Sequence, residues 1–229
     1  YNMEPASAFR IMSRKFEILD REWHSKMQKA FFKLNVNLLS TYNQNSFDQN
    51  ATDEDLRALF PLHPGTANLA THYATVVGAA TRGVFEFLAQ NDDIRNFLVN
   101  PDAFRHCDTI TADYLWDYIL KDLQNDVSHY GAVTERYNSY LNRVKNKGAA
   151  YFAVFRSLLL LNAFNNVSGN SNYGLITPSE ENIKSLYIGT RFASQIDDIL
   201  QWLNDESIIQ RAPGGMYSVQ FSALPPIEI

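Results

Sequence analysis

One stretch of the chain combines residue types that could take part in chemistry. The sequence FPLHPGTANLATHYATVVGAATRGVFEFL, residues 60–88, begins with a turn containing Pro61, His63 and Pro64, and places Arg82 between two apolar runs. A histidine can transfer protons or ligate a metal, and a lone cation can bind an anion. The plainer interpretation is a corner between two helices, in which His63 bonds backbone groups and Arg82 lies on the surface over an apolar face.

Other patterns that would indicate a catalytic or metal site are missing. The single cysteine, Cys107, follows a histidine, but no CxxC pair occurs. No phosphate-binding loop of the form GxxxxGK[ST] and no GxSxG nucleophile motif occurs. A metal- or carboxylate-dependent enzyme therefore has little support. The five histidines show no close ligand spacing: His24, His63, His72, His106 and His129.

Composition narrows the class of protein. The chain has 229 residues, of which 45% are hydrophobic, and this is enough for a large core. Its net charge of -5 does not favour binding to nucleic acid or to an anionic membrane. One cysteine excludes an internal disulfide and fits the cytoplasm. The longest apolar run, SLLLLNAF, is too short to cross a membrane, which takes about 20 residues. Because the chain starts at Tyr1 and ends in FSALPPIEI, we expect a piece of a longer polypeptide.

Apolar periodicity predicts a mainly α fold. It predicts helix over residues 5–40, with Pro5 in the first turn, and then a polar loop, TYNQNSFDQNATDED. Asp53 and Thr111 are predicted as N-caps of later helices. Further helices are expected over 65–78, 81–88 and 131–146, the last ended by Gly148. These elements give two predicted parts: N-terminal helices over residues 1–48 and a helical, lid-like domain over residues 53–146.

The last third, residues 149–224, predicts a winged-helix domain. An apolar helix, AAYFAVFRSLLLLNAFN, comes first, and Pro178 and Ser179 open a short second helix. After a turn at Gly189, RFASQIDDILQWLNDES forms a third helix, and two β-prone runs around a Pro-Gly-Gly turn form a hairpin. Helix, helix, turn, helix and hairpin is the order of a winged helix.

The third helix argues against direct DNA binding. A helix that reads the major groove carries basic or amide side chains outward, whereas this helix carries mostly carboxylates and only Arg191 at its start. The hairpin adds only Arg211. The domain is therefore better suited to packing or to binding a protein partner. The outward polar positions are Asp197, Asp198, Asn204, Asp205 and Glu206.

The stretch from PLHP to TRGVFEFL resembles a segment of large bacterial P-loop ATPases of the AAA+ type, namely those of BREX-type phage-defence systems and related ATP-binding proteins. The specific motif covers about 30 residues, and a lid followed by a winged helix extends the resemblance loosely over most of the chain. Glu86 and Phe87 depart from the expected basic and aliphatic residues, and the Walker motifs are absent. The matching residues are Pro61, His63, Pro64, Thr81, Arg82, Gly83, Val84 and Leu88.

The resemblance implies a function for the fragment. More loosely, the segment resembles the lid helix of initiator-type AAA+ proteins, which assigns Arg82 to sensing the γ-phosphate of bound nucleotide. On this view the fragment has no activity or cofactor of its own. ATP and Mg²⁺ would be bound by an upstream ATPase domain, with other defence-system proteins as partners and homo-oligomers as an option. The alternative is a self-standing winged-helix adaptor or DNA-binding regulator, which tight, salt-sensitive DNA binding would support.

Overall fold

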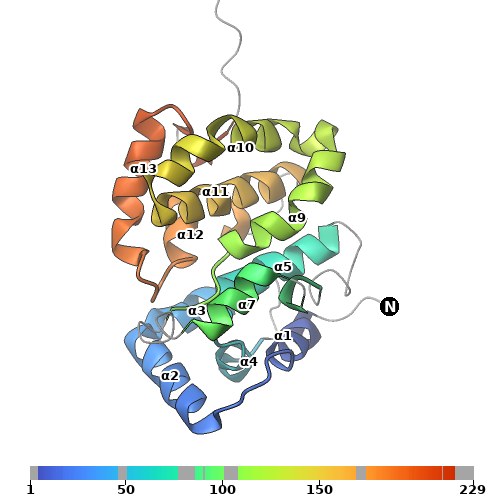
Figure 1. The fold of residues 1–229 in the computed structure, drawn as a ribbon, viewed down its shortest axis with the longest axis vertical. Helices are drawn as coiled ribbons and strands as arrows, with labels where there is room; N and C mark the ends of the chain where they lie inside the picture. The colour runs from blue at the N-terminus through green and yellow to red at the C-terminus, as the bar shows by residue number, and fades with distance from the viewer. Residues whose placement is uncertain are drawn as a thin grey trace, which may run out of the picture.

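The computed structural model describes a mainly helical chain with a small two-stranded antiparallel sheet. Helices α1 to α5 and α7 form the lower part of the molecule in Figure 1, and α9 to α13 form the upper part. The mainly α fold with one hairpin, as predicted, is therefore confirmed. The described residues are 5–45, 51–76, 86–89, 91–100, 108–168, 174–212 and 214–219.

The N-terminal part is helical as predicted, but its helices are interrupted. The prediction of helix over residues 5–40 is wrong for residues 14–20 and for Asn35, which are not helical. Asp20 restarts the helix by accepting a hydrogen bond from the Trp23 N–H at 2.9 Å. Pro5 does begin the first helix, as expected. The observed helices are α1 (Pro5–Ser13), α2 (Arg21–Leu34) and α3 (Val36–Asn45).

The loop was predicted to begin too early after residue 40, because residues 41–45 belong to α3. The next helix, α4 (Asp53–Ala58), is capped by Thr52 and not by Asp53. Thr52 and Asp55 bond each other's backbone N–H groups, which forms a capping box. Helix α5 (Pro64–Val76) follows the corner that carries Pro61 and His63, and α1 packs against both α4 and α5.

The described middle of the chain contains a short helical segment and three longer helices. Residues 86–89 are helical, and α7 (Asp92–Val99) begins after Asn91, whose side chain accepts backbone hydrogen bonds. Helix α9 (Asp113–Asn125) lacks the predicted Thr111 cap, because the Thr111 hydroxyl bonds the Asp113 carboxylate. Helix α10 (Val127–Lys147) ends at Gly148, as predicted.

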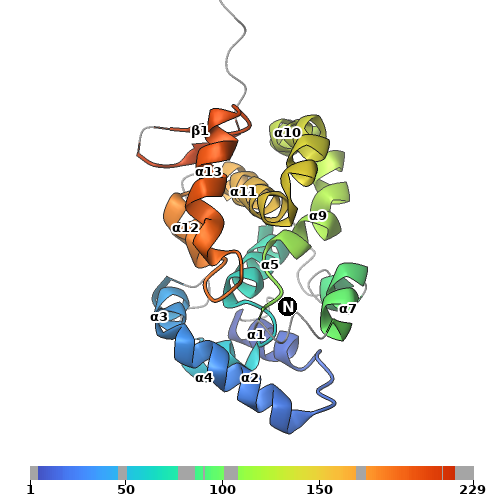
Figure 2. The same ribbon diagram turned by 60° about the vertical axis from the view of Figure 1, so that its left-hand side comes forward.

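Helix α11 (Ala149–Ser168) occupies the centre of the upper part, and Figures 1 and 2 both show it among its neighbours. It packs against α5, α9, α10 and α13. Its apolar run is buried as expected: Leu158 to Leu161 are each 0% exposed. Because α11 contacts both the lower and the upper helices, it is the common core element of the molecule.

The C-terminal elements follow the predicted order. A 3₁₀ turn (Gly174–Ile176) leads to α12 (Glu180–Ser185), which Ser179 caps. The third helix starts later than expected, with a 3₁₀ turn (Ala193–Gln195) before α13 (Ile196–Asp205).

Two strands, β1 (Gln210–Arg211) and β2 (Tyr217–Ser218), then pair antiparallel, with Arg211 opposite Tyr217. A third segment joins this hairpin. Ser179 pairs with Met216 in an antiparallel bridge, and the Tyr217 N–H donates to the Pro178 carbonyl oxygen at 2.7 Å. The residues just before α12 therefore extend the hairpin by one isolated bridge.

Candidate functional site

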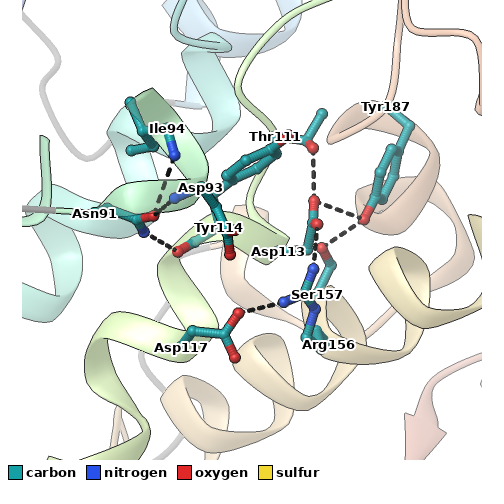
Figure 3. A network of polar contacts seen from close by, with 10 residues as sticks. All are labelled: Asn91, Asp93, Ile94, Thr111, Asp113, Tyr114, Asp117, Arg156, Ser157 and Tyr187. Atoms are coloured by element: carbon teal, nitrogen blue, oxygen red, sulfur yellow. Dashed lines mark hydrogen bonds and ion pairs between the residues drawn. The ribbon is translucent and has the colours of Figure 1, made fainter. Parts of the chain in front are cut away.

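The most polar interior site surrounds Arg156, the only charged residue in the apolar run of α11 (Figure 3). Its side chain is 13% exposed, and its Nη2 atom lies 2.8 Å from Oδ2 of Asp113 on α9. Its Nη1 atom pairs with the carboxylate of Asp117, one turn further along α9. The guanidinium carbon lies 4.4 Å from the centre of the Phe152 ring. Two carboxylates and an aromatic face thus hold one buried cation.

Burial and charge act against each other in this site. Burial raises the pKa of Asp117, although the neighbouring Arg156 favours its ionised form. Burial also disfavours the charged form of Arg156, but Asp113 and Asp117 outweigh it and raise the pKa of the guanidinium. Burial and the charge of Asp113 together raise the pKa of the Tyr187 phenol well above its usual value. The arginine therefore stays charged and Tyr187 stays neutral over the physiological range.

Hydrogen bonds extend the site from α9 to the loop after α12. The Thr111 hydroxyl donates to Asp113 at 2.6 Å, and the hydroxyls of Ser157 and Tyr187 lie 2.7 Å apart. Nearby, the backbone N–H of Arg191 donates to Asp108 at 3.0 Å, and its Nε lies 3.2 Å from the same carboxylate. Figure 3 shows Asp113, Ser157 and Tyr187 converging from separate elements. The network fixes the position of the loop before α13 relative to α9 and α11.

A cavity of about 590 Å³ opens beside this network. Its wall includes Asp113, Arg156 and the Tyr114 phenol, whose pKa burial and the Asp113 charge raise to about 12. Lys145 and Asp93 also line it. The cavity therefore offers hydrogen-bond donors and acceptors together with side chains of both charges. It suits a ligand group that is polar and forms hydrogen bonds. Within the ranges that the structure describes, no cluster of three or more His, Cys, Asp or Glu side chains is arranged to hold a metal ion.

The corner around His63 forms a second set of polar contacts, between the lower and upper parts. The Gly65 N–H donates to Nδ1 of His63 at 3.1 Å, so Nε2 carries the proton and donates to the Ile188 carbonyl oxygen at 3.3 Å. The His63 N–H donates to the Ile110 carbonyl oxygen at 3.1 Å, and the Thr66 hydroxyl donates to the same oxygen at 3.0 Å. The expectation that His63 bonds backbone groups is confirmed.

His63 is fully buried, and burial lowers its pKa to about 4, although the Ile188 carbonyl favours the protonated form. Glycines allow the close approach of the segments here. A Cβ atom on Gly65 would lie 2.3 Å from the Tyr42 hydroxyl, and one on Gly189 would lie 2.5 Å from Asn35. The corner is therefore a tightly packed junction with a neutral histidine at its centre.

The structure describes only some of the residues that the sequence analysis proposed for a functional site. Arg82 and the His106–Cys107 pair lie outside the described residues, so the structure gives no position for the nucleotide-sensing arginine. Arg156 and Asp113 were not predicted as site residues. A signal for Arg156 exists, since a single cation within an apolar helix needs a carboxylate partner in the core. Nothing in the sequence shows which carboxylate that is.

The comparisons with known proteins give no relative from which a role could be transferred. No protein-family model, no curated protein and no solved structure matches the chain. Among the described residues, no helix combines the length and apolar character needed to cross a bilayer.

Proposed function

We propose that this chain is the helical lid and winged-helix portion of a larger AAA+-like P-loop ATPase of a bacterial anti-phage defence system, acting in the cytoplasm. It has no catalytic activity of its own. The upstream ATPase domain binds ATP and Mg²⁺, Arg82 senses the bound nucleotide, and the chain passes the nucleotide state to partner proteins of the defence system.

The order of the C-terminal elements supports a winged helix. Helices α11, α12 and α13 are followed by the β1–β2 hairpin, which has the position of a wing. The Ser179–Met216 bridge lies where a winged helix carries a short strand, between its first and second helices. Ser179 also caps α12, so the bridge lies directly at the start of that helix.

The observation that carries the coupling role is the contact of His63 with Ile188. The motif PLHP, on which the resemblance to the ATPases rests, lies at the start of α5, and α5 leads towards the segment that contains Arg82. The same corner bonds Ile110 before α9 and Ile188 after α12. A displacement of α5 would therefore act directly on the winged-helix domain.

A protein partner fits this domain better than DNA. The exposed face of α13 carries Asp197, Asp198 and Asp205, and carboxylates repel the phosphates of a DNA backbone. Asp197 is bound to Lys184 of α12, which further reduces the positive charge that this surface could offer. Direct groove reading by α13 is therefore not part of the proposal.

The proposal is tested with the full-length ATPase. Arg82→Ala should lower ATP turnover by at least about tenfold, because an arginine that contacts the transferred phosphate contributes more than this in related chemistry. Arg95→Ala is the matched control, since Arg95 is 63% exposed and pairs locally with Asp92. Both variants should keep the thermal stability of the parent. Equal ATP turnover in all three proteins would contradict the proposed role of Arg82.

A further inference from the structure

Helix α2 presents a row of lysines that have no carboxylate partner among the described residues. Lys26, Lys29 and Lys33 are all exposed, and none of them forms an ion pair with a described residue. Spacings of three and four place them on one face of the helix, over a length of about 10 Å. Two exposed apolar side chains, Trp23 at 38% and Leu34 at 78%, border the same row. We call these three lysines the lysine row.

Helix α13 presents a matching row of opposite charge. Asp198, Gln201 and Asp205 are exposed, and neither aspartate forms an ion pair with a described residue. Their spacings are again three and four, so this aspartate row has the same length and pitch as the lysine row. Gln201 donates to Asp205 at 2.7 Å and holds that carboxylate in place. The half-buried Trp202 borders this row.

We propose that the lysine row of α2 binds the aspartate row of α13 in a second copy of this chain. Both helices lie along the left-hand margin in Figure 1, α13 in the upper part and α2 in the lower part, and both remain in clear view when this side is turned forward in Figure 2. A two-fold axis between them brings each α2 against the partner's α13 and forms both charged contacts at once.

The local match between the two charged rows favours a second copy as the partner. The net charge of -5 repels identical chains at long range, so association depends on local pairing of the two rows. The pairing fixes the register and orientation of α2 against α13 of the second copy. The side chains of Trp23, Leu34 and Trp202 add apolar area beside the charged contact. This interface does not involve Arg82 or nucleotide, and it stands or falls independently of the ATPase proposal.

Sedimentation velocity of the chain over a range of concentrations tests this interface. We expect a monomer–dimer equilibrium at low salt that shifts to monomer in about 1 M salt, where the screening length falls to about 3 Å. The triple variant Lys26→Glu, Lys29→Glu, Lys33→Glu should weaken the dimer at least about tenfold. The double variant Asp198→Lys, Asp205→Lys should do the same. Far-ultraviolet circular dichroism checks that both variants keep their helices.

Mixing the two variants gives the decisive result. Each variant alone places like charges against each other, whereas the mixed pair restores opposite charges at both contacts, so a heterodimer should form. Lys121→Glu with Lys145→Glu also makes the net charge more negative, but away from both rows, and should leave the dimer unchanged. A wild-type chain that stays monomeric at every concentration overturns the proposal. So does a dimer that survives both reversals, or a mixture that does not associate.

A polyanion is the competing occupant of the lysine row. If the wild-type chain stays monomeric and binds heparin, and the lysine variant loses that binding, the row serves a polyanion and the proposed dimer is wrong. If heparin binding is absent and the mixed variants associate, the second copy is the occupant.

Discussion

The Nε2 atom of His63 lies 3.3 Å from the carbonyl oxygen of Ile188, although 125 positions separate the two residues. The first residue belongs to the corner before α5, and the second follows α12. The imidazole is fully buried, and its other nitrogen accepts the Gly65 N–H. A proton on that nitrogen would face a donor, so the contact requires the neutral histidine.

Acid should weaken this junction. The pKa of His63 falls from 6.5 to about 4 through burial, so the unfolded chain binds a proton at a higher pH than the folded chain does. Stability is therefore complete above about pH 6.5 and falls as the pH drops towards 4, by up to about 3 kcal/mol for one such histidine. His63→Gln keeps a donor and removes the titration, so urea unfolding should depend less steeply on pH between 6.5 and 4.

Two comparisons make the pH prediction specific. Burial also lowers the pKa of His72 to about 4, so the variant should retain part of the pH dependence. His72→Gln is the matched variant, because His72 is also buried and its substitution should remove the other part. An identical slope in wild type and His63→Gln would mean that His63 does not titrate as its burial requires.

The loop at Gly189 should tolerate no side chain. Its φ of 82° is unfavourable for other residues, and a Cβ atom would lie 2.5 Å from both Asn35 and Phe31 of the lower part. We expect Gly189→Ala to lower the unfolding free energy by about 2–4 kcal/mol, since backbone strain and a steric clash add. Urea denaturation measures the change.

Gly214 supplies the matched control for this prediction. Its φ is 95°, but nothing lies within 4 Å of a Cβ atom placed there, so only the backbone strain remains. Gly214→Ala should therefore cost only about 1–2 kcal/mol. Equal losses at the two glycines would show that the loop does not pack against α2 as described.

Local signals in the sequence predicted much of the fold. Ser179, Gly148 and the turn at Gly189 mark ends and starts of elements because caps and positive φ angles depend on neighbouring residues alone. The same signals misplaced the cap at Asp53, since Thr52 and Asp55 form a reciprocal pair that stabilises the earlier start. Local chemistry therefore locates elements to within a few residues.

The site could not be predicted in the same way. Asp113 and Arg156 are 43 positions apart, and only the packing of α9 against α11 brings them together. Thr111 has the residue type of a helix cap, but the nearby carboxylate takes its hydroxyl. Such pairings depend on tertiary contacts between segments, and periodicity within one segment carries no information about them.

Removing the cation from the Arg156 site should destabilise the fold strongly. Arg156→Met leaves the carboxylate of Asp113, whose side chain is 5% exposed, without its partner, and an uncompensated buried charge costs about 3–5 kcal/mol. Asp117→Asn should cost about 1 kcal/mol, because Asp117 is 39% exposed and water can replace its partner.

The double variant Arg156→Met, Asp113→Asn should recover part of the loss, since neither charge then remains buried. Denaturant unfolding of the wild type, Arg156→Met, Asp113→Asn and the double variant forms a mutant cycle. No recovery in the double variant would mean that Asp113 is not the carboxylate that requires Arg156.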